Sequence, residues 1–329
     1  FYILLTFLLT GYLIYRAWLL LFPKYKAAAW FPILLWAIIP TVFWSYTHNM
    51  MENTMVIFIL LAVMSQIVAM REEKKPWFWL FLSALFIILA FLVKGPTALY
   101  PLAGIFVYWL CWRSFSFGRM LLLSSFVTVI VAGFLLLIFT HPHTELSMHN
   151  YLFERTLNRI NKIPIVTSRF WIVGNWLQQL ILPGLIVSVI YFINRTKGRL
   201  NSPPGELRNM AFLFGLGLCG VLPLMLTLVQ RPFYLVSVFP LFALALAIPV
   251  APAIKRFSRK ASEKKKYDWW LRGIALFIFM ATLVSTIAVA GKPKRSESTL
   301  ADVERIAERV GKEAEISASK TVGNDESLR

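Results

Sequence analysis

Residues 77–93 read WFWLFLSALFIILAFLV and contain no charged side chain. An α-helix needs about 20 apolar residues to cross the ~30 Å hydrocarbon core of a bilayer, so this run approaches the length of a membrane span. Such runs recur along the 329-residue chain, which is 58% hydrophobic, only 15% charged and has a mean hydropathy of +0.66. A soluble domain carries about a quarter charged residues. The composition therefore excludes an ordinary soluble enzyme and predicts a polytopic membrane protein.

About ten hydrophobic spans can be delimited in the same way. Because backbone groups in lipid have no water to pair with, each span is expected to form a helix, and the predicted fold class is an all-α polytopic membrane protein. The predicted spans are 1–22, 27–47, 53–70, 77–93, 96–112, 120–140, 171–194, 209–229, 233–253 and 270–290.

Basic residues follow every second span. Lys plus Arg is 34 against 16 Asp plus Glu, a formal net charge of +18. Nucleic-acid-binding proteins share such an excess, but here the basic residues occupy short links between apolar runs, which are typically cytoplasmic. Nucleic acid is therefore excluded as a partner. The basic links contain Lys24 and Lys26; Arg71, Lys74 and Lys75; Arg113 and Arg119; Arg195, Lys197, Arg199 and Arg208; and Lys255, Arg256, Arg259, Lys260, Lys264, Lys265 and Lys266.

The alternation predicts that the remaining links and the tail are external. Residues 1–291 are expected to form a transmembrane domain, and residues 292–329 the beginning of an external soluble domain in which 298–307 has the pattern of a capped amphipathic helix. The chain opens at Phe1 inside an apolar run, so an N-terminal segment is expected to be missing. Cys111 and Cys219 lie far apart in apolar runs and indicate neither a disulfide nor a metal site.

Two basic residues lie in short external links, 94–96 and 230–232, against the topology bias. Lys94 ends an apolar run before Gly95 and Pro96. An ionisable group at such a depth indicates a functional site for an anionic head group, and the alternative is a lysine that snorkels to the lipid surface. Arg231, with Tyr234 three residues on, suits bidentate contact with a phosphate, and the alternative is an interfacial belt of Arg and Tyr.

A third external link, 47–52, contributes further candidates. Glu52 begins a span, where a carboxylate is either a site residue or simply favoured by the positive end of the helix dipole. His48 and Asn49 precede it and are either part of the same site or polar residues of the membrane interface.

The longest external link, 141–170, contains an amphipathic pattern with Arg155 and Arg159 one helical turn apart. The two arginines are expected to grip a phosphate, and the alternative is contact with anionic lipid at the membrane surface. The three histidines of this link match no standard zinc pattern, so no metal and no other cofactor is expected.

Three stretches resemble motifs of the polyprenyl-phosphate-sugar-dependent membrane glycosyltransferases. They are residues 49–55 (NMMENTM), 93–102 (VKGPTALYPL) and 231–240 (RPFYLVSVFP). That family includes the protein O-mannosyltransferases and the lipid A aminoarabinose transferases, and it has the glycosyltransferase C fold. The resemblance covers most of the chain. It implies a multi-pass enzyme of the bacterial inner membrane that transfers a sugar from a polyprenyl phosphate to a lipid (lipid A-like) or protein acceptor on the periplasmic face.

In that family the catalytic carboxylate lies in the first external loop. The first visible span here resembles the family's second span, so the loop is expected to precede Phe1 and the chain as given to be inactive. We therefore assign no residue of the given chain as the catalytic base, and Glu52 is the fallback candidate for that role. The implied reaction inverts the sugar and needs no metal, because cationic side chains stabilise the leaving phosphate. The residues expected to bind the donor phosphate are Lys94, Arg231, Tyr234, Arg155 and Arg159.

Two other classes compete with a transferase. A secondary transporter would have a similar number of spans, but it would bind near the midplane through broken helices and internal repeats, whereas the notable charges here cluster at one face. A lipid-linked oligosaccharide ligase or polymerase would share the large external loop with arginines. An external loop with an Asp or Glu pair before Phe1 would favour the transferase.

Overall fold

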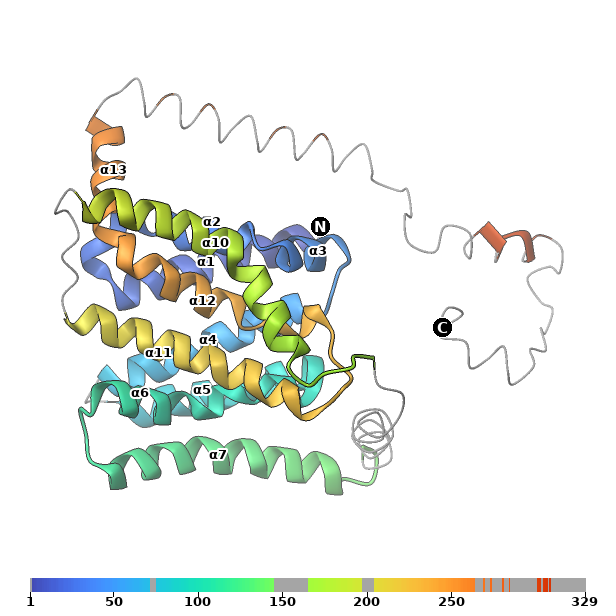
Figure 1. The fold of residues 1–329 in the computed structure, drawn as a ribbon. Coiled ribbons are helices and arrows are strands. Elements are labelled where there is room, and N and C mark those ends of the chain that lie inside the picture. The colour runs from blue at the N-terminus through green and yellow to red at the C-terminus, as the bar shows by residue number, and fades with distance from the viewer. Residues whose placement is uncertain are drawn as a thin grey trace. The chain divides into compact units, whose positions relative to one another are not determined.

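The computed structural model describes residues 2–71, 75–144, 165–196 and 204–263, together with 269, 273, 280, 284, 301, 302, 304–306 and 308. The chain divides into two compact units, residues 1–260 and residues 261–329. The first unit is a bundle of helices (Figure 1), and the described part of the chain contains no strand.

Seven stretches of the described chain are helical, long and apolar enough to cross a membrane. Each coincides with a predicted span, which confirms the all-α polytopic class. They are α1 (Tyr2–Leu21); α4 (Glu52–Arg71); α5 (Pro76–Lys94) with the 3₁₀ turn η2 (Gly95–Ala98); α7 (Phe117–Thr140); α10 (Trp171–Arg195); α11 (Pro204–Val221) with η5 (Leu222–Leu226); and α12 (Phe239–Ala247) with η7 (Ile248–Val250) and α13 (Ala251–Glu263). The predicted span 270–290 lies almost wholly outside the described residues.

The predicted span 27–47 is not one continuous helix. It consists of α2 (Trp30–Ala37) and α3 (Pro40–Thr47), which are bent by 74°. Pro40 lies in the first turn of α3, and Ile39 before it is extended at φ −68° and ψ 121°. A proline ring clashes with helical backbone in the residue that precedes it, so the helix ends before Pro40 and restarts in a new direction.

The predicted span 96–112 is also interrupted. Pro96 and Pro101 lie in two successive 3₁₀ turns, η2 and η3 (Tyr100–Ala103), and the α-helix α6 (Gly104–Trp112) begins only after them. Proline has no backbone N–H and can begin a helical turn but not continue one. The result is a shorter apolar helix than a full membrane span.

The centre of the bundle is formed by α4 and by the stretch from α12 to α13, where 67% and 61% of the residues in an apolar window of 18 are buried. In α7 and α10 only 17% of the residues in such a window are buried, so most of their side chains face outward. Most of the side chains that α7 exposes are apolar, with Leu136 and Leu137 64% and 68% exposed. Apolar residues on the outer surface are what a lipid environment requires, because hydrocarbon is the solvent there.

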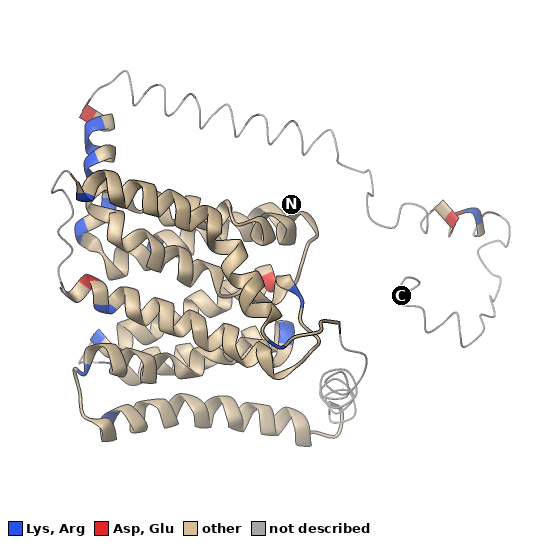
Figure 2. Cartoon of the chain, in the orientation of Figure 1, with Lys and Arg blue, Asp and Glu red and all other residues tan. Residues whose placement is uncertain are grey.

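Basic residues gather at one end of the bundle, as Figure 2 shows. At this end Arg71 donates to the carbonyl oxygen of Leu20 over 2.6 Å. The Tyr25 ring, in η1 (Pro23–Ala28), lies 5.4 Å from the Lys24 ammonium and 5.8 Å from that of Lys255. Basic links that were predicted to share one side of the membrane therefore lie together, while their placement in the cytoplasm stays a prediction.

The second unit contains the end of the chain. Among its described residues, 301, 302, 304–306 and 308 are helical, and Asp302 forms an ion pair with Arg305 at 3.7 Å. These residues lie within or next to the predicted amphipathic helix of the tail. The assignment of 292–329 to a separate external domain stays a prediction.

Candidate functional site

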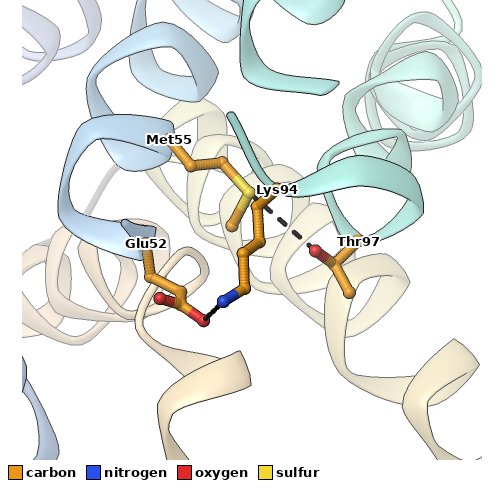
Figure 3. A network of polar contacts seen from close by, with 4 residues as sticks. All are labelled: Glu52, Met55, Lys94 and Thr97. Carbon is orange, nitrogen blue, oxygen red and sulfur yellow. Dashed lines mark hydrogen bonds and ion pairs between the residues drawn. The ribbon is translucent and has the colours of Figure 1, made fainter. Parts of the chain in front are cut away.

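Lys94 and Glu52 form an ion pair at the end of the bundle opposite the basic links. The Lys94 ammonium lies 3.0 Å from Oε1 of Glu52, and the Glu52 side chain is only 1% exposed whereas that of Lys94 is 29% exposed. Figure 3 shows the lysine at the end of α5 reaching back toward the first residue of α4. Two of the predicted site residues, from separate links, are thus in direct contact.

The backbone at Lys94 explains why its side chain is available at a helix end. α5 ends there because Gly95 has φ 77° and ψ −146°, a region that residues with a side chain rarely adopt. The following turn places the Thr97 hydroxyl 3.9 Å from the Met55 sulfur in α4 (Figure 3). The start of η2 and the start of α4 therefore pack together around the ion pair.

Two buried side chains fix the link that carries Glu52. The Ser45 hydroxyl lies 2.8 Å from Oδ1 of Asn53, and the Asn53 amide donates to the backbone oxygen of Ser45 over 2.9 Å. Between them the chain turns at Asn49, whose φ of 51° is left-handed. Asparagine tolerates this conformation better than most residues. The exposed Asn49 thus shapes the turn that delivers Glu52 to the site.

Phe233 connects Lys94 with the third predicted link. The Lys94 ammonium lies 5.6 Å from the centre of the Phe233 ring, and the Arg231 guanidinium lies 5.8 Å from the same centre. Both distances lie within the range of cation–π attraction. The exposed Arg231 precedes Pro232, which begins the 3₁₀ turn η6 (Pro232–Leu235). Two cations from distant parts of the sequence therefore flank one aromatic ring.

Aromatic side chains extend this cluster to the remaining predicted residues. Trp44 of α3 stacks on Phe233 with ring centres 6.1 Å apart, and on the His48 ring at 4.4 Å. Nδ1 of His48 lies 2.9 Å from the backbone oxygen of Trp44. Tyr234 packs edge-on against Phe233 at 4.9 Å. His48 and Tyr234 thus border the same cluster, which we call the Lys94 site: Glu52, Lys94, Arg231 and Phe233, with Trp44, His48 and Tyr234 around them.

Gln230 is a supporting residue that the sequence did not reveal. It is 1% exposed, and its side-chain oxygen accepts the backbone N–H of Ile172 over 2.8 Å. Its amide nitrogen donates to the backbone oxygens of Arg169, Leu224 and Thr227 over 2.9, 3.2 and 2.8 Å. These bonds hold the residue before Arg231 against the start of α10. Because all four partners are backbone groups, no pattern of residue types points to them.

The charges of the site favour an anionic ligand. Apart from the ion pair, neither oxygen of Glu52 accepts a hydrogen bond from a described residue. Among the described residues of the site, the carboxylate offsets one positive charge, and Glu52, Lys94 and Arg231 together carry a net positive charge. Arginine in particular suits the bidentate geometry of a phosphate. A partly desolvated anion with two or more oxygens fits this arrangement.

Not every predicted residue can be placed. Arg155 and Arg159 lie outside the described residues, so their relation to the Lys94 site stays a prediction. The described part of the helical unit contains two acidic residues, Glu52 and Glu206. Glu206 contacts Tyr25 at the basic end, which leaves Glu52 as the one described carboxylate beside Lys94.

No protein-family profile and no curated protein matches the sequence. Two solved structures are similar in fold. The crystal structure of ArnT from Cupriavidus metallidurans bound to undecaprenyl phosphate superposes with a TM-score of 0.53 at 17% identity, over 94% of this chain and 58% of that one. The apo form of the same ArnT gives a TM-score of 0.49 at 18% identity, over 89% and 51%. The chain thus spans little more than half the length of ArnT, whose fold it shares over that part.

Proposed function

We propose that the protein is a membrane glycosyltransferase that takes a sugar from a polyprenyl-phosphate donor. The observation that carries the proposal is the meeting of Lys94 and Arg231 on one aromatic ring at one end of the bundle. A cationic pair at the end of a membrane span suits the phosphate of a lipid whose chain lies in the bilayer. The fold shared with an ArnT that was crystallised with undecaprenyl phosphate supports the same assignment.

The proposed chemistry assigns a role to each cation. When the bond between the sugar and the phosphate oxygen breaks, negative charge develops on the departing polyprenyl phosphate. Lys94 and Arg231 stabilise that charge, a contribution of roughly 3 kcal/mol for each donor in comparable oxyanion sites. An acceptor hydroxyl attacks from the opposite face and inverts the anomeric centre, and a carboxylate takes its proton as general base. This scheme needs no metal.

Glu52 fits a positioning role better than the role of base. It is almost fully buried and already paired with Lys94. A general base must reach the acceptor hydroxyl within hydrogen-bond distance, which a buried and ion-paired carboxylate does not do without moving. We therefore assign Glu52 to orienting the Lys94 ammonium, and we name no described residue as the base.

The proposed orientation follows from the charges. With the basic links in the cytoplasm, the Lys94 site faces the periplasm of a bacterial inner membrane. The acceptor there is a lipid of the lipid A type or a protein. A transporter would place its charged residues near the middle of the membrane, whereas Lys94 is the last residue of α5.

A transfer assay tests the proposal. Membranes containing the full-length protein are incubated with a radiolabelled sugar on undecaprenyl phosphate and with a lipid and protein extract of the envelope. We expect label to move from the donor to an acceptor fraction. Lys94→Ala and Arg231→Ala are expected to lower the rate at least 100-fold each, because each removes a donor to the leaving phosphate.

The matched control is Lys26→Ala, which removes an exposed basic side chain from η1 at the opposite end of the bundle. It is expected to leave the rate within about twofold of the wild type, since it lies far from the leaving group and exposed charges are screened over about 10 Å. Normal turnover by both site variants, at normal protein levels, would refute the assignment of these cations.

A further inference from the structure

A cavity of about 670 Å³ lies among α2, α10 and α13, at the basic end of the bundle. It is separate from the Lys94 site. α4 runs for 20 residues from Glu52, at that site, to Arg71, whose guanidinium contacts the end of α1. At ~1.5 Å per residue the two ends of α4 are about 30 Å apart, roughly the thickness of the hydrocarbon core.

The cavity combines an apolar wall with a basic rim. The apolar part includes Leu34 of α2 and Ile186 and Ile190 of α10, which are side chains of membrane-spanning helices. The basic part consists of Arg256 and Lys260, one helical turn apart on α13. Residues four apart on a helix lie on the same face, so both cations border the same opening.

A hydrogen bond holds the two sides of the cavity together. The indole N–H of Trp30, in α2, donates to the hydroxyl of Ser258, in α13, over 3.0 Å. Both Trp30 and Phe257 line the cavity. Aromatic residues with a polar partner are typical of the depth where lipid head groups begin. The cavity thus reaches from head-group level into the apolar part of the bundle.

We propose that this cavity binds an anionic glycerophospholipid. Its phosphate lies against Arg256 and Lys260, and one acyl chain lies along Leu34, Ile186 and Ile190. Basic pockets between transmembrane helices are suited to anionic head groups. A wholly apolar groove would accept any lipid, whereas the two cations favour one with a net negative charge. The bound lipid fastens α13 to α2 and α10.

This site does not depend on the proposed glycosyltransferase activity, because it lies at the other end of the helices and takes a different lipid. To test the site, phosphatidylglycerol or phosphatidylcholine is added to the purified protein at equal concentrations. Native mass spectrometry then counts the phospholipid molecules that each sample retains. We expect at least fivefold more phosphatidylglycerol than phosphatidylcholine to remain bound.

Three variants distinguish the cavity from general attraction to the basic surface. The double variant Arg256→Gln/Lys260→Gln is expected to lower phosphatidylglycerol binding roughly tenfold. Arg259→Gln is the matched control, since it removes a charge from the same helix but does not line the cavity, and we expect binding to be unchanged. Leu34→Trp keeps every charge and narrows the apolar wall, and it is expected to lower binding severalfold.

Equal retention of the two phospholipids would overturn the proposal, as would an equal loss in Arg259→Gln and in the double variant. Either result would mean that the lipid is held by surface charge and not by the cavity. Leu34→Trp keeps the test informative if the double variant does not fold. Unchanged phosphatidylglycerol binding in Leu34→Trp would contradict the placement of an acyl chain in the cavity.

Discussion

Lys94 has two roles that can be separated by mutation. It pairs with Glu52, which is 1% exposed, and in the proposed function it also presents a positive charge beside Phe233 to the donor phosphate. The first role concerns stability and the second concerns binding. A buried carboxylate that loses its partner is strongly destabilising, whereas removing both charges of a buried pair is often nearly neutral.

The single variant Lys94→Gln is therefore expected to lower the free energy of unfolding by up to about 3 kcal/mol, because the buried Glu52 loses its partner. The double variant Lys94→Gln/Glu52→Gln is expected to regain most of that loss. Reversible unfolding in mixed detergent micelles measures both. If the double variant is no more stable than Lys94→Gln, the ion pair does not have the structural role described here.

At the scale of elements, the site depends on breaks in helices. α5 ends at Lys94 because Gly95 adopts φ 77°. Gly95→Ala is expected to cost about 1–3 kcal/mol, since a Cβ is strained in this backbone region. Gly118→Ala in α7 is the control: a Cβ there meets no atom within 4 Å, and alanine is favoured over glycine in a helix. Thermal unfolding should show the first variant destabilised and the second unchanged or slightly stabilised.

Gln230 joins the loop before Arg231 to the start of α10 through bonds to Ile172 and Arg169, and its amide also lies within hydrogen-bond distance of the Leu224 and Thr227 oxygens in its own loop. Gln230→Ala leaves several backbone groups unpaired, so we expect a loss of about 2 kcal/mol or more in stability and a severalfold weaker binding of polyprenyl phosphate. The matched control is Gln179→Ala, which removes a single bond from the backbone N–H of Thr41. Equal losses in the two variants would mean that Gln230 has no special part in holding the loop.

The same elements show what the sequence could and could not predict. Long apolar runs such as 77–93 can be predicted to be membrane spans, because the bilayer sets their length and composition. The bend at Pro40 was missed because apolar residues continue on both sides of the proline, so hydropathy does not change there. The candidates Lys94 and Arg231 can be found as basic residues against the topology bias, and Glu52 as a carboxylate that begins a span. That Phe233 would bring two of them together depends on packing between distant segments, which no local pattern contains.

At the scale of the whole molecule, the orientation in the membrane can be tested. We expect the turn at Met51 to be external and Arg259 to be cytoplasmic. Both residues are exposed, Met51 by 62%. Single cysteines at these positions, in a background without Cys111 and Cys219, are treated with an impermeant thiol reagent in cells with a permeabilised outer membrane. We expect Met51→Cys to react and Arg259→Cys to react only after lysis. The reverse pattern would invert the topology.

The central claim is that the Lys94 site binds the phosphate of a polyprenyl lipid, and equilibrium binding of radiolabelled undecaprenyl phosphate to the purified protein tests it most directly. We expect saturable binding of undecaprenyl phosphate that undecaprenol, which has no phosphate, does not displace. The ion-pair-free variant Lys94→Gln/Glu52→Gln, combined with Arg231→Gln, should bind at least tenfold more weakly, as the loss of charged hydrogen-bond donors implies. Equal binding by the wild type and this variant, or full competition by undecaprenol, would contradict the claim.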